Sequence, residues 1–161
     1  MEMLNGFFKS GQNRDELFGE SKVMFGDLLR LDVNRMYEEI TNKDKLKKVL
    51  EGKLEDYNSG ADQRMSLVFF SDAIHHILRI CRALRQPRGN IMLIGVGGSG
   101  KQSLTKLSAA MYDIKYKVIE MKKDYKISDF RDFIKGIMFA TAGIEREKKI
   151  PEPTVFTLTD S

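Results

Sequence analysis

Cysteine is nearly absent from this sequence, which contains one, Cys81. A single thiol excludes an internal disulfide framework and any zinc site built from cysteines. Cys81 falls on the apolar side of a predicted helix, and a buried cysteine behaves as a small hydrophobic residue. We therefore expect it to pack in the core rather than to react.

Long apolar runs are also missing. No stretch approaches the roughly 20 apolar residues that a membrane-spanning helix needs, so we expect no membrane association. The first residues, 1–9, lack a basic leader followed by a sustained apolar run, which predicts no secretory signal and a cytoplasmic location. The chain also lacks a strong charge of one sign, because 27 basic and 23 acidic side chains leave a net charge of +4. The basic clusters at 122–123 and 146–149 are short, so we expect no nucleic-acid partner.

What is present is the composition of a globular protein. Hydrophobic residues make up 42% of the chain and charged residues 31%. A chain of about 150 residues can bury roughly two-thirds of its unfolded surface, so a real core is possible. Residues 1–40 show only weak periodicity and are interpreted as a lead-in segment of uncertain structure.

Helical periodicity begins at Thr41. Thr41 or Asn42 is placed to cap the first predicted helix, which ends at 58–60, where Asn, Ser and Gly follow one another. A second amphipathic helix follows Ser71 and ends before Pro87. The apolar faces of these two helices are formed by Leu46, Val49, Leu50, Leu54 and Tyr57, and by Ile74, Ile77, Leu78, Cys81 and Leu84.

The period changes after residue 90. The apolar run 91–94 is typical of a strand buried on both faces, and it leads into a glycine-rich loop and a helix that starts near Lys101. A second strand is predicted over 117–121, a longer helix from Ser128, and a third strand over 153–159. This alternation predicts an α/β fold with parallel strands joined by helical crossovers. The last helix has the expected apolar face Phe130, Phe133, Ile134, Ile137 and Met138, with Gly143 as its expected stop.

The loop is Gly95-Val96-Gly97-Gly98-Ser99-Gly100-Lys101, which fits the first seven places of the phosphate-binding pattern G-x-x-x-x-G-K-[ST]. Glycines allow backbone angles that turn successive N–H groups inward, and the helix that follows directs its positive end at the same point. Lys101 would reach the terminal phosphates. The loop, together with Gln102 and Ser103, is thus predicted to bind a nucleotide phosphate. The alternative is a glycine-rich turn with a solvated lysine.

One position departs from the pattern. The residue after Lys101 should carry a hydroxyl that coordinates Mg²⁺, but it is Gln102, and the hydroxyl of Ser103 comes one position late. A helix turns about 100° per residue, so Ser103 is not expected to replace that ligand directly. We expect nucleotide binding to survive this change better than efficient hydrolysis.

A second chemical element closes the chain. Residues 155–160 are predicted to form a strand that ends in the carboxylate of Asp160, as in the Walker B segment that holds the magnesium shell. We expect Asp160 to act on Mg²⁺ through water. In AAA+ ATPases the next residue is typically a Glu that polarises the attacking water, and here it is Ser161, which cannot act as that base.

With these residues in view, the chain resembles the fourth AAA+ module of a dynein heavy chain, most closely of the axonemal type. The signature is Gln86-Pro87-Arg88-Gly89 followed by the glycine loop and Gln102-Ser103-Leu104. Further resembling segments are Phe25-Gly26-Asp27, Tyr37-Glu38-Glu39-Ile40, Leu54-Glu55-Asp56-Tyr57-Asn58, Asp72-Ala73-Ile74-His75-His76, Arg79-Ile80-Cys81-Arg82 and Pro153-Thr154-Val155-Phe156 to Thr159-Asp160.

The resemblance implies a P-loop AAA+ parallel-sheet core, incomplete and preceded by an α-helical lead-in, with residues 41–161 as the N-terminal part of the module. It implies a regulatory site for ATP or ADP with Mg²⁺, in which the segment 67–69 forms part of the adenine wall. Gln102 and Ser161 are themselves similar to the axonemal form of this module. The implied location is the cytoskeleton, in the axoneme of a cilium or flagellum.

Partners follow from the same resemblance. They are the neighbouring AAA+ modules of the heavy chain, one of which would supply an arginine finger, the other dynein subunits, and microtubules through the full-length motor only. The sensor residues, the stalk and the microtubule-binding tip have no counterpart in these residues. Two alternatives stay open from the sequence: a small P-loop kinase or other P-loop NTPase, and a structural remnant that binds nothing.

Overall fold

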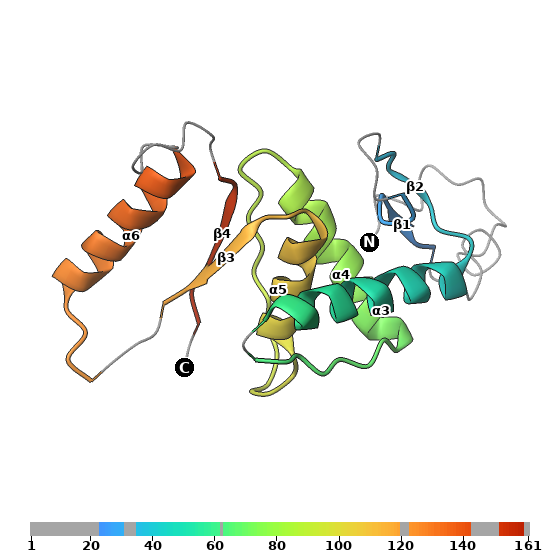
Figure 1. Cartoon of the computed structure of the whole chain (residues 1–161), viewed down its shortest axis with the longest axis horizontal. Helices are drawn as coiled ribbons and strands as arrows, with labels where there is room; N and C mark the ends of the chain where they lie inside the picture. The colour runs from blue at the N-terminus through green and yellow to red at the C-terminus, as the bar shows by residue number, and fades with distance from the viewer. Residues whose placement is uncertain (1–22, 31–34, 62, 120–122, 143–151, 160–161) are drawn as a thin grey trace, which may run out of the picture.

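The structure is a computed structural model that describes residues 23–30, 35–61, 63–119, 123–142 and 152–159. Two short antiparallel strands come first, three helices follow, and a parallel strand pair with its crossover helix comes last (Figure 1). Within the described part of the chain, no helix is both long and apolar enough to cross a membrane. The elements are β1 (Phe25–Gly26), β2 (Glu38–Glu39), α3 (Lys43–Gly60), α4 (Ser71–Arg85), α5 (Lys101–Met111), β3 (Lys115–Val118), α6 (Ile127–Thr141) and β4 (Thr154–Thr157).

Helix α3 begins where the sequence predicts. The side chain of Asn42 accepts a hydrogen bond from the backbone N–H of Lys45 at 2.8 Å, which satisfies one of the free N–H groups at the helix start. Leu46 and Leu50 are fully buried, one turn apart, against the rest of the core. The predicted cap and apolar face of this helix are confirmed.

The core lies among α3, α4 and α5. Helix α4 buries Ile74, Ile77, Leu78 and Cys81 on the predicted face. The Cys81 side chain is only 2% exposed, and burial raises the pKa of its thiol to about 12. A thiol in this state is protonated at physiological pH and unreactive, so the expected packing role is confirmed.

The first of the two short strands, β1, lies against α4. Phe25 pairs with Glu39 and Gly26 pairs with Glu38 in antiparallel register. A Cβ at Gly26 would lie 2.9 Å from the Cδ2 of Leu78, so the absence of a side chain there allows the strand to approach the helix closely. We call residues 23–27 and 37–40, which contain these two strands, the N-terminal hairpin.

The parallel pair confirms the predicted crossover topology. Strand β3 pairs with β4 in parallel, from Lys115 opposite Thr154 to Val118 opposite Thr157. Helix α6 connects them, and the strand pair lies between α6 and α5 (Figure 1). Phe133 of α6 packs on Phe156 of β4 with ring centroids 5.8 Å apart. Strand β3 begins two residues earlier than the sequence predicts.

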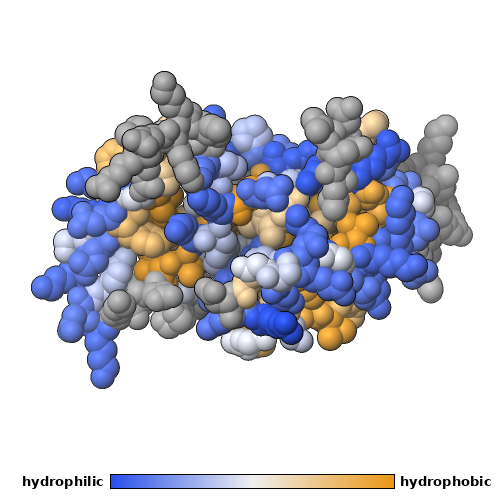
Figure 2. All heavy atoms as spheres, viewed as in Figure 1, coloured by the Kyte–Doolittle hydropathy of each residue, from blue (hydrophilic) through white to orange (hydrophobic). Residues whose placement is uncertain are grey.

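The prediction of a buried strand over 91–94 is wrong. The run 91–94 is not a strand, and Met92 and Ile94 are 82% and 90% exposed. The described strands β3 and β4 pair with each other, so no ladder hydrogen bonds hold this run in a sheet. Helix α6 buries no residue fully, and apolar side chains gather on the surface over α6 and β4, at the left of Figure 2.

Two glycines lie inside helices at positions where the packing does not require the absence of a side chain. Gly52 lies inside α3 and Gly136 inside α6, and a Cβ at either would meet no atom within 4 Å. Alanine is favoured over glycine inside a helix by about 1 kcal/mol. We therefore expect Gly52→Ala and Gly136→Ala each to raise the free energy of unfolding by about 0.5–1 kcal/mol, measured by urea denaturation. A lower midpoint for either variant would contradict this account of the helix.

Candidate nucleotide-binding site

The glycine loop connects the exposed run 91–94 to α5. Gly100 is the N-cap of α5 in the left-handed conformation, with φ of 78° and ψ of 9°, and Gly98 has φ of 74°. Only glycine adopts these angles without strain. The backbone N–H of Ser99 donates to the Val96 carbonyl at 3.3 Å and closes a turn within the loop. Helix α5 begins at Lys101, as predicted.

Lys101 holds the loop closed. Its Nζ donates to the carbonyl oxygens of Gly95 and Val96, at 2.6 Å and 2.9 Å. An ammonium group has three N–H donors, so one remains for an anion placed over the loop. The positive charge of Lys101 is therefore fixed at the mouth of the loop before any ligand binds.

The start of α5 supplies further donors. The first hydrogen bond within the helix runs from the N–H of Leu104 to the carbonyl of Gly100, at 2.8 Å. The N–H groups of Lys101, Gln102 and Ser103 precede that bond and have no acceptor within the helix. The helix dipole places a partial positive charge at the same end. These groups can together bind a phosphate.

Helix α5 is well supported behind the loop. Leu107 and Met111 are fully buried, and the hydroxyl of Thr105 donates to the Lys101 carbonyl at 2.8 Å. An exposed loop mounted on a buried helix keeps its donors in place without a ligand. The predicted residues from Gly95 to Ser103 therefore lie together in one loop and helix start.

The structure describes only some of the residues that the sequence analysis considered for Mg²⁺. Gln102 is exposed, and Ser103, the next residue, is half-buried. Asp160 and Ser161 lie outside the described residues. Within the part of the chain that the structure describes, no group of three or more His, Cys, Asp or Glu side chains could hold a metal ion.

The segment expected to contact adenine precedes α4. Phe69 is 6% exposed and belongs to the core, whereas Val68 is 76% exposed. Leu67 is half-buried against the core. Phe70, which the sequence analysis did not single out, is 62% exposed and is the N-cap residue of α4. Val68 and Phe70 are therefore the two exposed large apolar side chains of residues 67–70.

A polar contact that the sequence did not predict holds the C-terminal end of α5 in place. The hydroxyl of Tyr112 donates to Oδ1 of Asp27 at 2.6 Å, and Nη1 of Arg85 lies 3.6 Å from Oδ2. Burial, and then the neighbouring Cys81 and Asp27, raise the pKa of the Tyr112 hydroxyl well above its usual value. The phenol therefore remains a donor. This link joins the helix of the glycine loop to the N-terminal hairpin.

Comparison with known proteins gives consistent matches. Residues 65–161 match the family described as the P-loop containing dynein motor region D4. The chain is 37% identical over 149 residues, or 91% of its length, to human dynein axonemal heavy chain 6, and 41% identical over 140 residues, or 86%, to mouse dynein axonemal heavy chain 3. It is 38% identical over 148 residues, or 91%, to the dynein-1-beta heavy chain of the flagellar inner arm I1 complex of Chlamydomonas reinhardtii. The chain spans about 3% of the length of each of these relatives.

Proposed function

Because this chain belongs to the dynein heavy-chain family, in the motor region named D4, we propose that its glycine loop binds the phosphates of ATP or ADP. The observation that carries this proposal is the position of Lys101, whose Nζ is held by two loop carbonyls with one donor left over. Family membership sets aside the small kinase that the sequence left open.

The proposed site extends from Gly95 to Ser103. Backbone N–H groups at the start of α5 would hold phosphate oxygens, and Val68 and Phe70 would contact the base. Mg²⁺ would be bound mainly by phosphate and water, with the amide oxygen of Gln102 near it and Asp160 acting through water. When bound, the ion would offset the charge of the phosphates.

We further propose that the site regulates rather than drives the motor. Two residues support this: Gln102 stands where a hydroxyl ligand of Mg²⁺ is usual, and Ser161 where a water-polarising Glu is usual. Neither change removes a group that binds phosphate. Binding without rapid turnover would let bound nucleotide set the conformation of this region.

The names of the relatives support a proposal for the cellular location and the partners. Those relatives are named as axonemal and flagellar heavy chains, which supports a role in microtubule-based movement within a cilium or flagellum. The proposed partners are neighbouring AAA+ modules and the other dynein subunits, with microtubules reached only through the full-length motor.

Substitution of Lys101 tests the binding proposal. We expect Lys101→Ala to weaken ADP binding about 10- to 100-fold, because a hydrogen bond to a charged group is worth about 1.5–3 kcal/mol. The measurement is isothermal titration calorimetry of the folded proteins. Lys106→Ala is the matched control, since Lys106 lies on the same helix with its Nζ 5.5 Å from the centre of the Tyr116 ring.

Equal ADP affinity for wild type and Lys101→Ala would contradict the proposal. Absence of binding in both would favour the remaining alternative, a structural remnant without a ligand. An equal loss in Lys106→Ala would show that the helix, rather than the Lys101 ammonium, determines the affinity.

A further inference from the structure

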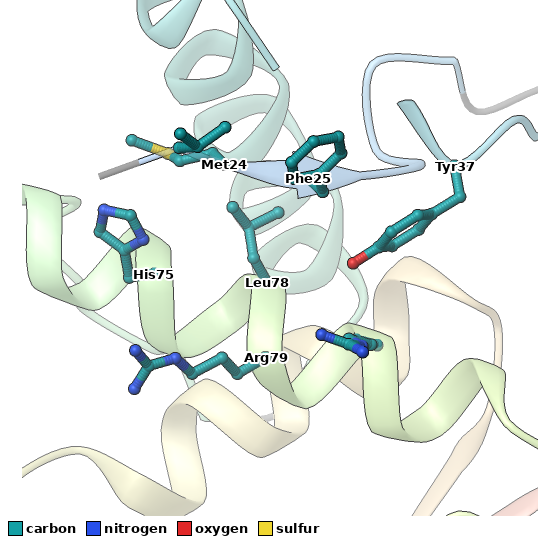
Figure 3. Close-up of a pocket in the computed structure, with 8 residues that line it drawn as sticks. Met24, Phe25, Tyr37, His75, Leu78 and Arg79 are labelled. Atoms are coloured by element: carbon teal, nitrogen blue, oxygen red, sulfur yellow. The ribbon is translucent and has the colours of Figure 1, made fainter. Parts of the chain in front are cut away.

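A pocket of about 320 Å³ lies between the N-terminal hairpin and α4, away from the glycine loop. We call it the hairpin pocket. Figure 3 shows Met24, Phe25 and Tyr37 on one side of it and His75, Leu78 and Arg79, from α4, on the other. Arg82 completes the lining on the helix side.

The wall formed by the hairpin is apolar and aromatic. The rings of Phe25 and Tyr37 are stacked with centroids 6.4 Å apart, and they are 47% and 42% exposed. Leu78 points from α4 toward this wall (Figure 3). Aromatic residues, including Phe and Tyr, are enriched in the cores of protein interfaces relative to the rest of the surface.

The opposite rim of the pocket is positively charged. Arg79 and Arg82 are exposed, and neither forms an ion pair with any residue that the structure describes. Arg85, one turn further along the same helix, differs because it binds the buried Asp27 and lies 5.4 Å from the centre of the Tyr37 ring. Among these three arginines, only Arg85 has an ion-pair partner within the described residues.

Within the described residues, neither glutamate of β2 forms an ion pair with Arg79 or Arg82. Glu38 of β2 is engaged by Arg30, with the Nε of Arg30 3.5 Å from its Oε1. An apolar wall beside two arginines that form no ion pair among the described residues is complementary to a ligand that combines an apolar side chain with carboxylates.

We propose that the hairpin pocket binds an extended acidic peptide segment of a protein partner. An aromatic or aliphatic side chain of the peptide contacts Phe25, Tyr37 and Leu78. Two carboxylates of the peptide contact Arg79 and Arg82. Residues three apart on a helix have Cβ atoms about 5–6 Å apart, and alternate residues of an extended chain lie about 7 Å apart on one face, so the two spacings match.

The spacing defines the peptide. An apolar residue followed by acidic residues two and four positions later puts all three side chains on one face of an extended chain. We choose the probe Ser-Phe-Ser-Glu-Ser-Glu-Ser with a fluorescent dye at its N-terminus. The matched probes replace both Glu by Gln, or Phe by Ala.

Fluorescence anisotropy on the whole chain tests the proposal. We expect saturable binding of the acidic probe with a Kd below about 1 mM, and at least about tenfold weaker binding for each matched probe. The double variant Arg79→Glu, Arg82→Glu is expected to weaken the acidic probe at least tenfold, whereas Arg79→Lys retains most of the affinity. Because both arginines are exposed, we expect the double variant to keep the circular dichroism and ADP affinity of the wild type.

The control variant Arg64→Glu, Lys48→Glu makes the same change in net charge with residues that do not line the pocket. An equal loss of affinity in this control would overturn the proposal in favour of nonspecific attraction. Absence of saturable binding by the wild type would overturn it as well. Displacement of the probe by inorganic phosphate at matched ionic strength, with no dependence on the Phe of the probe, would show a simple anion site instead.

Discussion

Purified protein is expected to bind ATP and to release phosphate from it no faster than the Lys101→Ala variant does. Gln102 and Ser161 stand where a hydroxyl ligand of Mg²⁺ and a water-polarising Glu are usual, and the proposed source of the arginine finger is a neighbouring module that the assay does not contain. The finger is worth about 10³ to 10⁵ in rate where it operates. The loss of a general base typically costs about another 10² to 10⁴. Either loss alone would make turnover slow.

The measurement is steady-state phosphate release with saturating ATP and Mg²⁺. The Lys101→Ala variant reports the contribution of contaminating ATPases, because it lacks the ammonium group that would contact the terminal phosphates. Turnover near one per second that disappears in this variant would overturn the regulatory proposal and favour a self-sufficient enzyme.

Local signals explain which helices the sequence predicts well. Helix α3 has a cap at Asn42 and buried leucines one turn apart, and α4 has a stop at Pro87, so neither depends on distant residues for its boundaries. Helix α5 follows a glycine in the left-handed conformation, which the loop motif itself contains. Each boundary is encoded within a few residues, where periodicity and capping rules apply.

Strands depend on partners that a short window does not contain. The run 91–94 has the composition of a buried strand, yet β3 and β4 pair with each other and leave it outside the ladder. The N-terminal hairpin shows the converse. Its strands are two residues each, too short for a period-2 pattern, and they form where Gly26 allows close contact with Leu78.

The glycine loop and the contacts around it differ in the same way, because the loop is local in sequence and the contacts are not. The glycine loop was predictable as one structural unit because its glycines, Lys101 and the helix start are contiguous, and Lys101 contacts the carbonyls of Gly95 and Val96 in the same loop. The contact between Asp27 and Tyr112 joins residues 85 positions apart, and no sequence pattern brings them together. The hairpin pocket is likewise visible only once β1 lies on α4.

Substitution of Gly100 is expected to abolish nucleotide binding and leave the rest of the fold in place. Gly100 has φ of 78°, and a β-branched residue there is strained by about 1–3 kcal/mol. Gly100→Val would relieve that strain by moving to negative φ. This rotates the peptide group that leads into Lys101 and disturbs the first hydrogen bond of α5, from Leu104 to Gly100. The N–H groups at the helix start would then no longer converge on one point.

We expect Gly100→Val to bind ADP more than about 100-fold more weakly than wild type, a difference of about 2.7 kcal/mol. Circular dichroism should show most of the helical signal, because α3, α4 and α6 do not include the loop. Gly52→Val is the matched control, since Gly52 lies in open space within α3 and has an ordinary φ. If Gly100→Val keeps the wild-type affinity, the loop is not the binding site. Gly52 lies outside the loop. An equal loss of ADP affinity in Gly52→Val would therefore show that destabilised helices, rather than the backbone conformation of Gly100, cause the effect.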